Sequence, residues 1–182
     1  MSAQFLIATS KVIQDPFHQS IIYLCHHQNH SGGMGLIINK TIADVDLSGV
    51  LNHLDIEHQH NHSSSVFMGG PIHADRGIIV YKPAHGKSHN TDVNLSHSKE
   101  FLNTIVDGQG PNDFFLALGH TSWKPGQLQS ELQDHSWLLY ETPSTSIRDE
   151  LLFFAPIASR YRLACELLGF RPQQLSWQEG RA

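Results

Sequence analysis

Ser122 is the side chain in this sequence that comes nearest to a catalytic nucleophile. It lies in DFFLALGHTSWKPGQLQSEL, residues 113–132, after an apolar run and before a helical pattern. Hydrolases that present a serine between a strand and a helix use G-x-S-x-G, because small residues relieve the strained turn. Here Gly119 lies three positions before Ser122, and Lys124 occupies the place of the second glycine. We therefore predict no catalytic residue in this stretch.

The same stretch is typical of a turn between a strand and a helix. The apolar run predicts a strand over residues 113–119. Pro125 suits the first turn of a helix, and the hydroxyl of Thr121 or Ser122 would accept a hydrogen bond from a free N–H at the helix start. We therefore expect a helix with a hydroxyl cap after the strand.

Two other stretches carry residues that can ligate metal ions. His58, His60 and His62 alternate, so an extended segment would point all three imidazoles the same way, as zinc or nickel requires. Residues 44–55, DVDLSGVLNHLD, approach the spacing of a calcium loop, but a strand rather than a helix precedes them. The polar surroundings of the histidines favour adventitious binding over a dedicated site. We predict no metal site and no cofactor, and we interpret Asp46 as the N-cap of a helix.

The composition restricts the kinds of partner. The 182 residues carry a formal net charge of −5, and lysine and arginine are scattered. Direct nucleic-acid binding is disfavoured, because its affinity comes largely from neutralised phosphates. No apolar segment reaches the roughly 18 residues of a membrane helix, and the first residues do not resemble a signal peptide. We expect one domain over residues 1–182, located in the cytoplasm, with Cys25 and Cys165 as buried free thiols.

The hydrophobic pattern predicts an α+β fold. Apolar runs bounded by turn residues predict strands, and apolar residues three and four apart predict helices. The predicted strands span residues 5–8, 19–27, 34–40, 65–70, 76–83, 113–119 and 136–142. The predicted helices span residues 46–54, 98–108, 125–135, 146–154 and 156–169. Regular βαβ alternation is absent, so we expect a mixed, largely antiparallel sheet with helices packed on it.

Seven segments resemble, in the same order, segments of one bacterial family. They are FLIATS, DPFHQSIIYLCHH, GGMGLIINKT, FMGGPI, RGIIVY, GHTSWKPGQLQSEL and RYRLACELLG. The chain is similar to the AlgH/YqgE family over about residues 4–182. The resemblance implies a cytoplasmic α+β protein whose bifurcated sheet folds into a pseudo-barrel with surrounding helices. The AlgH name implies a link to the transcriptional regulation of alginate production, and the resemblance implies no chemical activity.

Two positions depart from the pattern of that family. The pattern Gly-Tyr/His-x-Gly-Trp-x-x-Gly-Gln-Leu is matched at Gly119, Trp123, Gly126, Gln127 and Leu128. Ser122, however, stands where the family has a glycine, so it is not a nucleophile that the family shares. Arg181 stands where the family ends in Gly-His-Ala, so a role for that histidine does not carry over to this chain.

These observations favour a non-enzymatic regulatory or protein-interaction factor that acts through a protein partner or a small ligand. The alternative is a small-ligand-binding protein, or an enzyme of unknown reaction, with a site near the loops that match the family. Its candidate ligand-binding residues are Gly69, Gly70, Pro71, Arg76 and Trp123. Arg76 would offer a rigid fork to a carboxylate or phosphate, and Trp123 a flat apolar wall.

Overall fold

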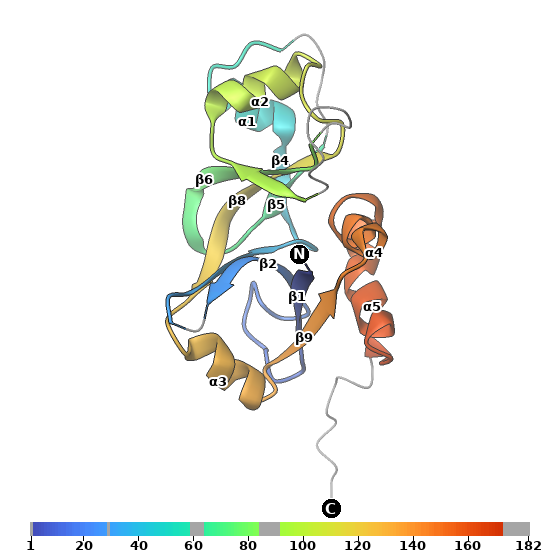
Figure 1. Cartoon of the computed structure of the whole chain (residues 1–182). Coiled ribbons are helices and arrows are strands. Elements are labelled where there is room, and N and C mark those ends of the chain that lie inside the picture. Colours follow the sequence, from blue (N-terminus) through green and yellow to red (C-terminus); the bar gives the residue numbers. More distant parts are fainter. Residues whose placement is uncertain (1, 29, 59–63, 84–91, 173–182) are drawn as a thin grey trace, which may run out of the picture. The chain divides into compact units, whose positions relative to one another are not determined.

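The computed structural model shows an α+β protein with a largely antiparallel mixed sheet (Figure 1), which confirms the predicted fold class. It describes residues 2–28, 30–58, 64–83 and 92–172. The chain forms two compact units: the terminal unit, residues 1–40 with 121–182, and the central unit, residues 41–120. Strand β8 (Phe114–Trp123) contributes its last three residues to the terminal unit and the others to the central unit.

Four whole strands and the end of β8 form the sheet of the terminal unit. In spatial order they are β9 (Trp137–Thr142), β1 (Ala3–Ala8), β2 (Ile21–Gln28), β3 (Gly32–Ile37) and β8. All the pairings are antiparallel, and Phe5 of β1 lies opposite both Tyr140 and Tyr23. One face of this sheet buries a cluster made of Leu6, Ala8, Ile22, Leu24, Ile37, Trp123, Leu128 and Trp137.

Four helices are described in the terminal unit, and hydrogen bonds hold the last of them to the sheet. They are α3 (Gln127–Gln133), α4 (Thr145–Asp149), the π-helix η1 (Glu150–Phe154) and α5 (Ile157–Leu167). On α5, the Tyr161 hydroxyl donates to the carbonyl of Ala8 at 2.6 Å, and the Arg160 guanidinium donates to the carbonyl of Ile38 at 2.7 Å. Burial lowers the pKa of Arg160 to about 10. These bonds hold α5 against β1 and β2.

The central unit packs two helices against its own strands. The strands are β4 (Thr41–Asp46), β5 (Ser65–Met68), β6 (Ile72–Tyr81), β7 (Asn94–Ser96) and the greater part of β8. Only the pairing of β5 with β8 is parallel among those described in this unit. Helices α1 (Leu47–His53) and α2 (Lys99–Val106) contribute to a core of Leu47, Leu51, Ile56, Val66, Ile79, Leu102, Ile105 and Leu116.

The N-termini of α1 and α2 are capped by side chains, which accept hydrogen bonds from backbone N–H groups at the helix start. The carboxylate of Asp46 accepts from the backbone N–H of Gly49 at 2.8 Å, which confirms the N-cap that the sequence predicts. The hydroxyl of Ser98 accepts from the N–H of Phe101 at 3.0 Å. Because Asp46 serves this helix, its stretch is a helix start and not a calcium loop.

Strand β8 extends beyond its predicted end, which corrects the interpretation of GHTSW as a turn. It runs to Trp123, and exposed Ser122 lies in the strand opposite Met34 of β3. Helix α3 begins after Gly126, whose backbone is left-handed at φ +76°, and no side chain caps this terminus. The expected hydroxyl cap is therefore wrong, because pairing with β3 holds Thr121 and Ser122 in the sheet.

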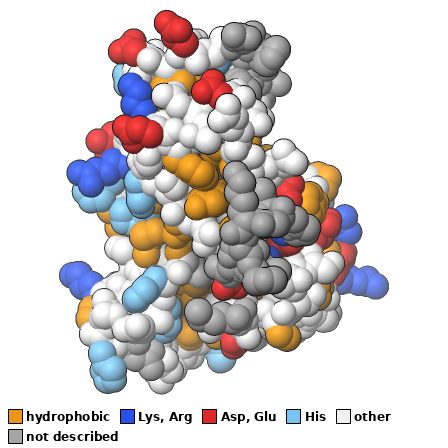
Figure 2. Space-filling model, turned by 45° about the horizontal axis from the view of Figure 1, so that its top comes forward, with side chains coloured by type: hydrophobic (Ala, Val, Ile, Leu, Met, Phe, Trp, Pro, Cys, Tyr) orange, Lys and Arg blue, Asp and Glu red, His pale blue; other side chains and the backbone are white. Residues whose placement is uncertain are grey.

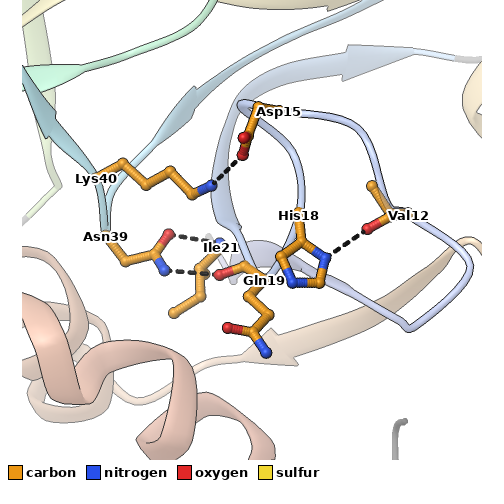
Figure 3. A network of polar contacts seen from close by, with 7 residues as sticks. All are labelled: Val12, Asp15, His18, Gln19, Ile21, Asn39 and Lys40. Atoms are coloured by element: carbon orange, nitrogen blue, oxygen red, sulfur yellow. Dashed lines mark hydrogen bonds and ion pairs between the residues drawn. The ribbon is translucent and has the colours of Figure 1, made fainter.

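The loop between β1 and β2 is fixed by polar contacts (Figure 3). The side chain of Asn39 accepts from the N–H of Ile21 at 2.8 Å and donates to the carbonyl of Gln19 at 2.9 Å. A ring nitrogen of His18 lies 3.2 Å from the carbonyl of Val12 within the loop. The Asn39 side chain thus replaces a pair of backbone hydrogen bonds between neighbouring strands, and it holds the end of the loop beside the sheet.

Candidate functional site

The residues proposed from the sequence lie in both units. Gly69 and Gly70 are buried after β5, Pro71 is exposed, and Arg76 is exposed on β6, all within the central unit. Trp123 lies at the end of β8 in the terminal unit, and only 6% of its surface is exposed. Arg76 and Trp123 therefore belong to different units, and their convergence on one ligand stays a prediction.

The two glycines after β5 have a clear packing role. The N–H of Gly69 donates to the carbonyl of Leu118 at 2.9 Å. Gly119 of β8 has φ +70°, and a Cβ built there would collide with the carbonyl oxygen of Gly70. The backbones approach so closely that a side chain at Gly119 would require one of them to move. The glycine-rich segment therefore positions the β5–β6 turn against β8.

A largely apolar cavity of about 530 Å³ lies in the central unit, between α1, α2 and the sheet. We call it the α1–α2 cavity. Its apolar wall is formed by Val45, Val50, Leu54, Ile79, Leu102, Leu116 and Leu118. Five charged or titratable side chains also line it: Asp44, His53, Asp75, His97 and Lys99. A small apolar molecule would therefore meet an apolar wall and a few polar groups that could orient it.

Some of these polar groups are held in place by backbone atoms. A ring nitrogen of His97 lies 3.3 Å from the carbonyl of Gly77, and the ammonium of Lys99 donates to the carbonyl of Leu54. The Lys99 contact joins the start of α2 to the end of α1, on either side of the cavity. These contacts give the α1–α2 cavity a preformed rim.

Basic side chains gather near Arg76 of β6. The imidazole rings of His73 and His120 lie 5.6 Å apart between centroids. Burial lowers the pKa of His120, and the charges of His73, His97 and Arg76 lower it further. Figure 2 shows several histidine side chains on one face, some of them beside Lys or Arg side chains.

A second cavity, of about 580 Å³, lies in the terminal unit beside Trp123. We call it the Trp123–Trp137 cavity. Trp137 of β9 lines it as well, and only 5% of the surface of Trp137 is exposed. The indole N–H groups of Trp123 and Trp137 both donate to Oε2 of Glu131, at 2.8 Å each. The other oxygen of Glu131 accepts from the side-chain amide of Gln127 at 2.9 Å.

Neither Glu131 nor Trp137 is among the candidate residues that the sequence predicts. The signal was present as two tryptophans and a glutamate within 15 residues, 123 to 137. It becomes meaningful only when β8 is known to continue to Trp123 and β9 to begin at Trp137, because α3 then carries Glu131 between the two strands. The expected turn at GHTSW concealed this arrangement.

Both cysteines are free thiols, as the sequence predicts. Cys165 is buried, and burial is the main cause that raises its pKa. Cys25 is half-buried rather than fully buried, because β2 bulges between Leu24 and His26, and burial raises its pKa to about 12. Neither thiol therefore resembles an activated nucleophile.

The part of the chain that the structure describes contains no cluster of three or more metal-ligating side chains. His58 is described, and a ring nitrogen of it lies 3.1 Å from the carbonyl of Ile56. His60 and His62 lie outside the described residues. None of the described helices combines the length and apolar character needed to cross a lipid bilayer.

Solved structures that resemble this chain share its whole fold. The solution structure of the AlgH protein from Pseudomonas aeruginosa matches with a TM-score of 0.74 and 30% identity, over 99% of this chain and 95% of that one. A crystal structure of a protein from Corynebacterium diphtheriae matches with a TM-score of 0.67 over 95% of this chain and 88% of that one. At 18% identity, the second likeness shows the fold alone.

Sequence relatives extend over the same length. A UPF0301 protein of Vibrio cholerae is 36% identical over 192 aligned positions, which cover 100% of this chain and 99% of the relative. A UPF0301 protein of Pseudoalteromonas translucida is 34% identical over 98% of this chain and 96% of its own. A family model described as AlgH-like matches residues 5–173. With the fold shared throughout and the sequence matched along nearly its whole length, the chain belongs to the AlgH-like family of bacterial proteins.

Proposed function

We propose that this chain is a small-ligand-binding protein with a regulatory role, and that its ligand occupies the α1–α2 cavity of the central unit. The observation that carries the proposal is the cavity itself. Its volume of about 530 Å³ lies within the range of about 300 to 1,000 Å³ that is usual for small-molecule sites. Its wall is mainly apolar, as in most such sites.

The lining indicates the kind of ligand. The apolar side chains of Val50, Leu54 and Leu102 would bury the body of an apolar molecule, and each buried Å² of apolar surface contributes about 25 cal/mol. His97 and Asp75 would orient a polar group at the rim. The ligand that we propose is therefore a small molecule with an apolar body and at least one hydrogen-bonding group.

The regulatory part of the proposal rests on the family and on charge. The resemblance to the AlgH/YqgE family implies a link to transcriptional regulation, and this chain has a net charge of −5. A protein with this net negative charge is poorly suited to bind the phosphates of a nucleic acid. We therefore propose that occupancy of the cavity alters contact with a protein partner in the cytoplasm, in preference to direct binding of DNA.

The test uses the full-length chain and the apolar fluorescent probe N-phenylnaphthylamine. We expect saturable binding to the native protein. Val50→Trp would place an indole in the α1–α2 cavity and should weaken probe binding at least about tenfold. The matched control is Asn103→Trp, at an exposed position of α2 that does not line the cavity. Thermal unfolding of each variant establishes that it is folded.

Two results would overturn the proposal. One is the absence of probe binding to the native protein, and the other is equal binding to Val50→Trp and to Asn103→Trp. The protein partner is tested separately, in a pull-down that compares the proteins bound from cytosol by the native chain and by Val50→Trp. A DNA complex at about 50 mM salt whose affinity falls steeply with added salt would contradict the route through a protein partner.

A further inference from the structure

We propose that the Trp123–Trp137 cavity of the terminal unit is a second binding site, and that it takes the quaternary ammonium group of a small organic cation. The site is independent of the α1–α2 cavity, and its chemistry is different. It combines one carboxylate, three aromatic rings and an exposed aliphatic side chain around a cavity of about 580 Å³. Each of these features favours a methylated cation.

The carboxylate of Glu131 supplies the negative charge. Its position is fixed by three N–H donors, from Trp123, Trp137 and Gln127, so it lies in the wall with little freedom to move. None of the ion pairs between described residues includes Glu131. Lys11 also lines the cavity, but its ammonium donates at 2.6 Å to the carbonyl of Asp134, at the end of α3.

Three aromatic rings line the cavity, and two pairs among them are set nearly at right angles. The ring of Phe17 is inclined at 89° to that of Trp137, with the centroids 6.2 Å apart. The ring of Trp123 is inclined at 84° to that of Trp137, with the centroids 6.5 Å apart. All three residues line the cavity. Rings set at right angles form corners, and the negative face of an aromatic ring attracts a cation, Trp most strongly.

The hydrogen bonds on Glu131 favour a quaternary over a primary ammonium group. A primary ammonium carries three N–H donors, each of which needs an acceptor when it leaves water. The two oxygens of Glu131 already accept three N–H groups and have little capacity left. A trimethylammonium group has no N–H to satisfy, so it would gain the charge and ring attraction without that penalty.

An exposed apolar residue at the cavity supports the same ligand. Ile13, in the loop between β1 and β2, lines the cavity with 77% of its surface exposed, and Val12 lies beside it. The methyl groups of a trimethylammonium ion would cover such side chains, whereas a bare ammonium would not. Val12 packs against the core cluster that contains Trp123 and Trp137, and its carbonyl lies 3.2 Å from a ring nitrogen of His18 within the loop.

The test compares choline with two close analogues. One is its uncharged isostere, in which a carbon replaces the nitrogen, and the other is ethanolamine, which carries a primary ammonium. We expect choline to shift the indole N–H resonances of Trp123 and Trp137 in NMR spectra, with Trp177→Phe used to identify the third tryptophan. Choline should bind at least about tenfold more tightly than either analogue.

Two variants test the charges. Glu131→Gln keeps an oxygen acceptor for the indoles and removes the negative charge, so choline binding should fall at least about tenfold. Lys11→Gln removes a positive charge from the lining and should tighten choline binding. Glu166→Gln, at an exposed position of α5, is the control and should leave choline binding unchanged. Val50→Trp should also leave it unchanged, because that residue lies in the other cavity.

Three results would overturn this inference. The first is the absence of indole shifts with choline up to about 50 mM, a concentration above the millimolar Kd of a weak site. The second is equal binding of choline and its uncharged isostere. The third is unchanged binding to Glu131→Gln when its unfolding shows that the variant is folded. Ethanolamine binding as tightly as choline would overturn the preference for a quaternary group.

Discussion

Trp123 and Trp137 share one hydrogen-bond acceptor. Their indole N–H groups, which come from different strands, both donate to Oε2 of Glu131 at 2.8 Å. Both side chains are almost fully buried, so water cannot replace this carboxylate as the acceptor. Without Glu131, each indole N–H would have no hydrogen-bond partner. Glu131 of α3 therefore joins the end of β8 to the start of β9.

Removal of this acceptor should destabilise the protein strongly. Glu131→Ala leaves two buried N–H donors without a partner, at a cost of about 1 to 3 kcal/mol each, so the free energy of unfolding should fall by about 2 to 6 kcal/mol. Glu131→Gln keeps an acceptor and should lose less. Urea unfolding measures both. Glu166→Ala is the control and should change the free energy of unfolding by less than about 0.5 kcal/mol. An equally small change in Glu131→Ala would contradict the role of Glu131 as shared acceptor.

Gly119 and Gly126 allow backbone strain to be separated from steric collision. Both have φ near the left-handed region, at +70° and +76°. A Cβ at Gly126 meets nothing within 4 Å, whereas a Cβ at Gly119 collides with the carbonyl of Gly70. Gly126→Ala should cost about 1 to 2 kcal/mol for the conformation alone, and Gly119→Ala clearly more. Equal shifts in thermal unfolding would show that the loop after β5 moves aside freely.

Asn39 should control the order of the loop between β1 and β2. Asn39→Ala removes both bonds to the backbone and should cost about 1 to 3 kcal/mol, because the N–H of buried Ile21 loses its acceptor. Hydrogen exchange at the Ile21 amide should then accelerate. Lys40→Ala is the control, since its ion pair with exposed Asp15 spans 3.4 Å and contributes little. Unchanged exchange at Ile21 in the Asn39 variant would refute this role.

The lowered pKa of His120 predicts weaker folding in mild acid. Burial is the first cause, and the positive charges of His73, His97 and Arg76 add to it. Below the unfolded pKa of about 6.5, the unfolded chain binds a proton at this site that the folded chain does not. The free energy of unfolding should therefore fall as the pH drops from neutral through about 6.5 towards the folded pKa.

Substitution isolates the contribution of this histidine. His120→Gln removes the titrating group, so the loss of stability between about pH 7 and pH 5 should become smaller. His53→Gln, at an exposed position of α1, serves as the control. Urea unfolding across this pH range provides the measurement. A His120→Gln variant with the same pH dependence as the native protein would show that His120 does not contribute.

Local signals in the chain were sufficient for the helices and for most strands. Asp46 is an N-cap because its side chain and the helix that it caps are neighbours in sequence. The strands β1, β2 and β9 are visible as apolar runs because burial within a sheet selects such side chains. The predicted fold class followed from their order. Strands β4 and β7 escaped prediction, because one has half-exposed side chains and the other is only three residues long.

Tertiary packing decided the candidate sites. The end of β8 depends on pairing with β3, a segment more than 80 residues away, and this pairing overrode the turn that Gly119 and Pro125 suggest. The meeting of Trp123 and Trp137 at Glu131 follows from that longer strand. The α1–α2 cavity likewise has walls from segments that only the folded central unit brings together. The periodicity of a sequence indicates which side chains are buried. A cavity, however, depends on which residues from other segments face those side chains in the folded protein.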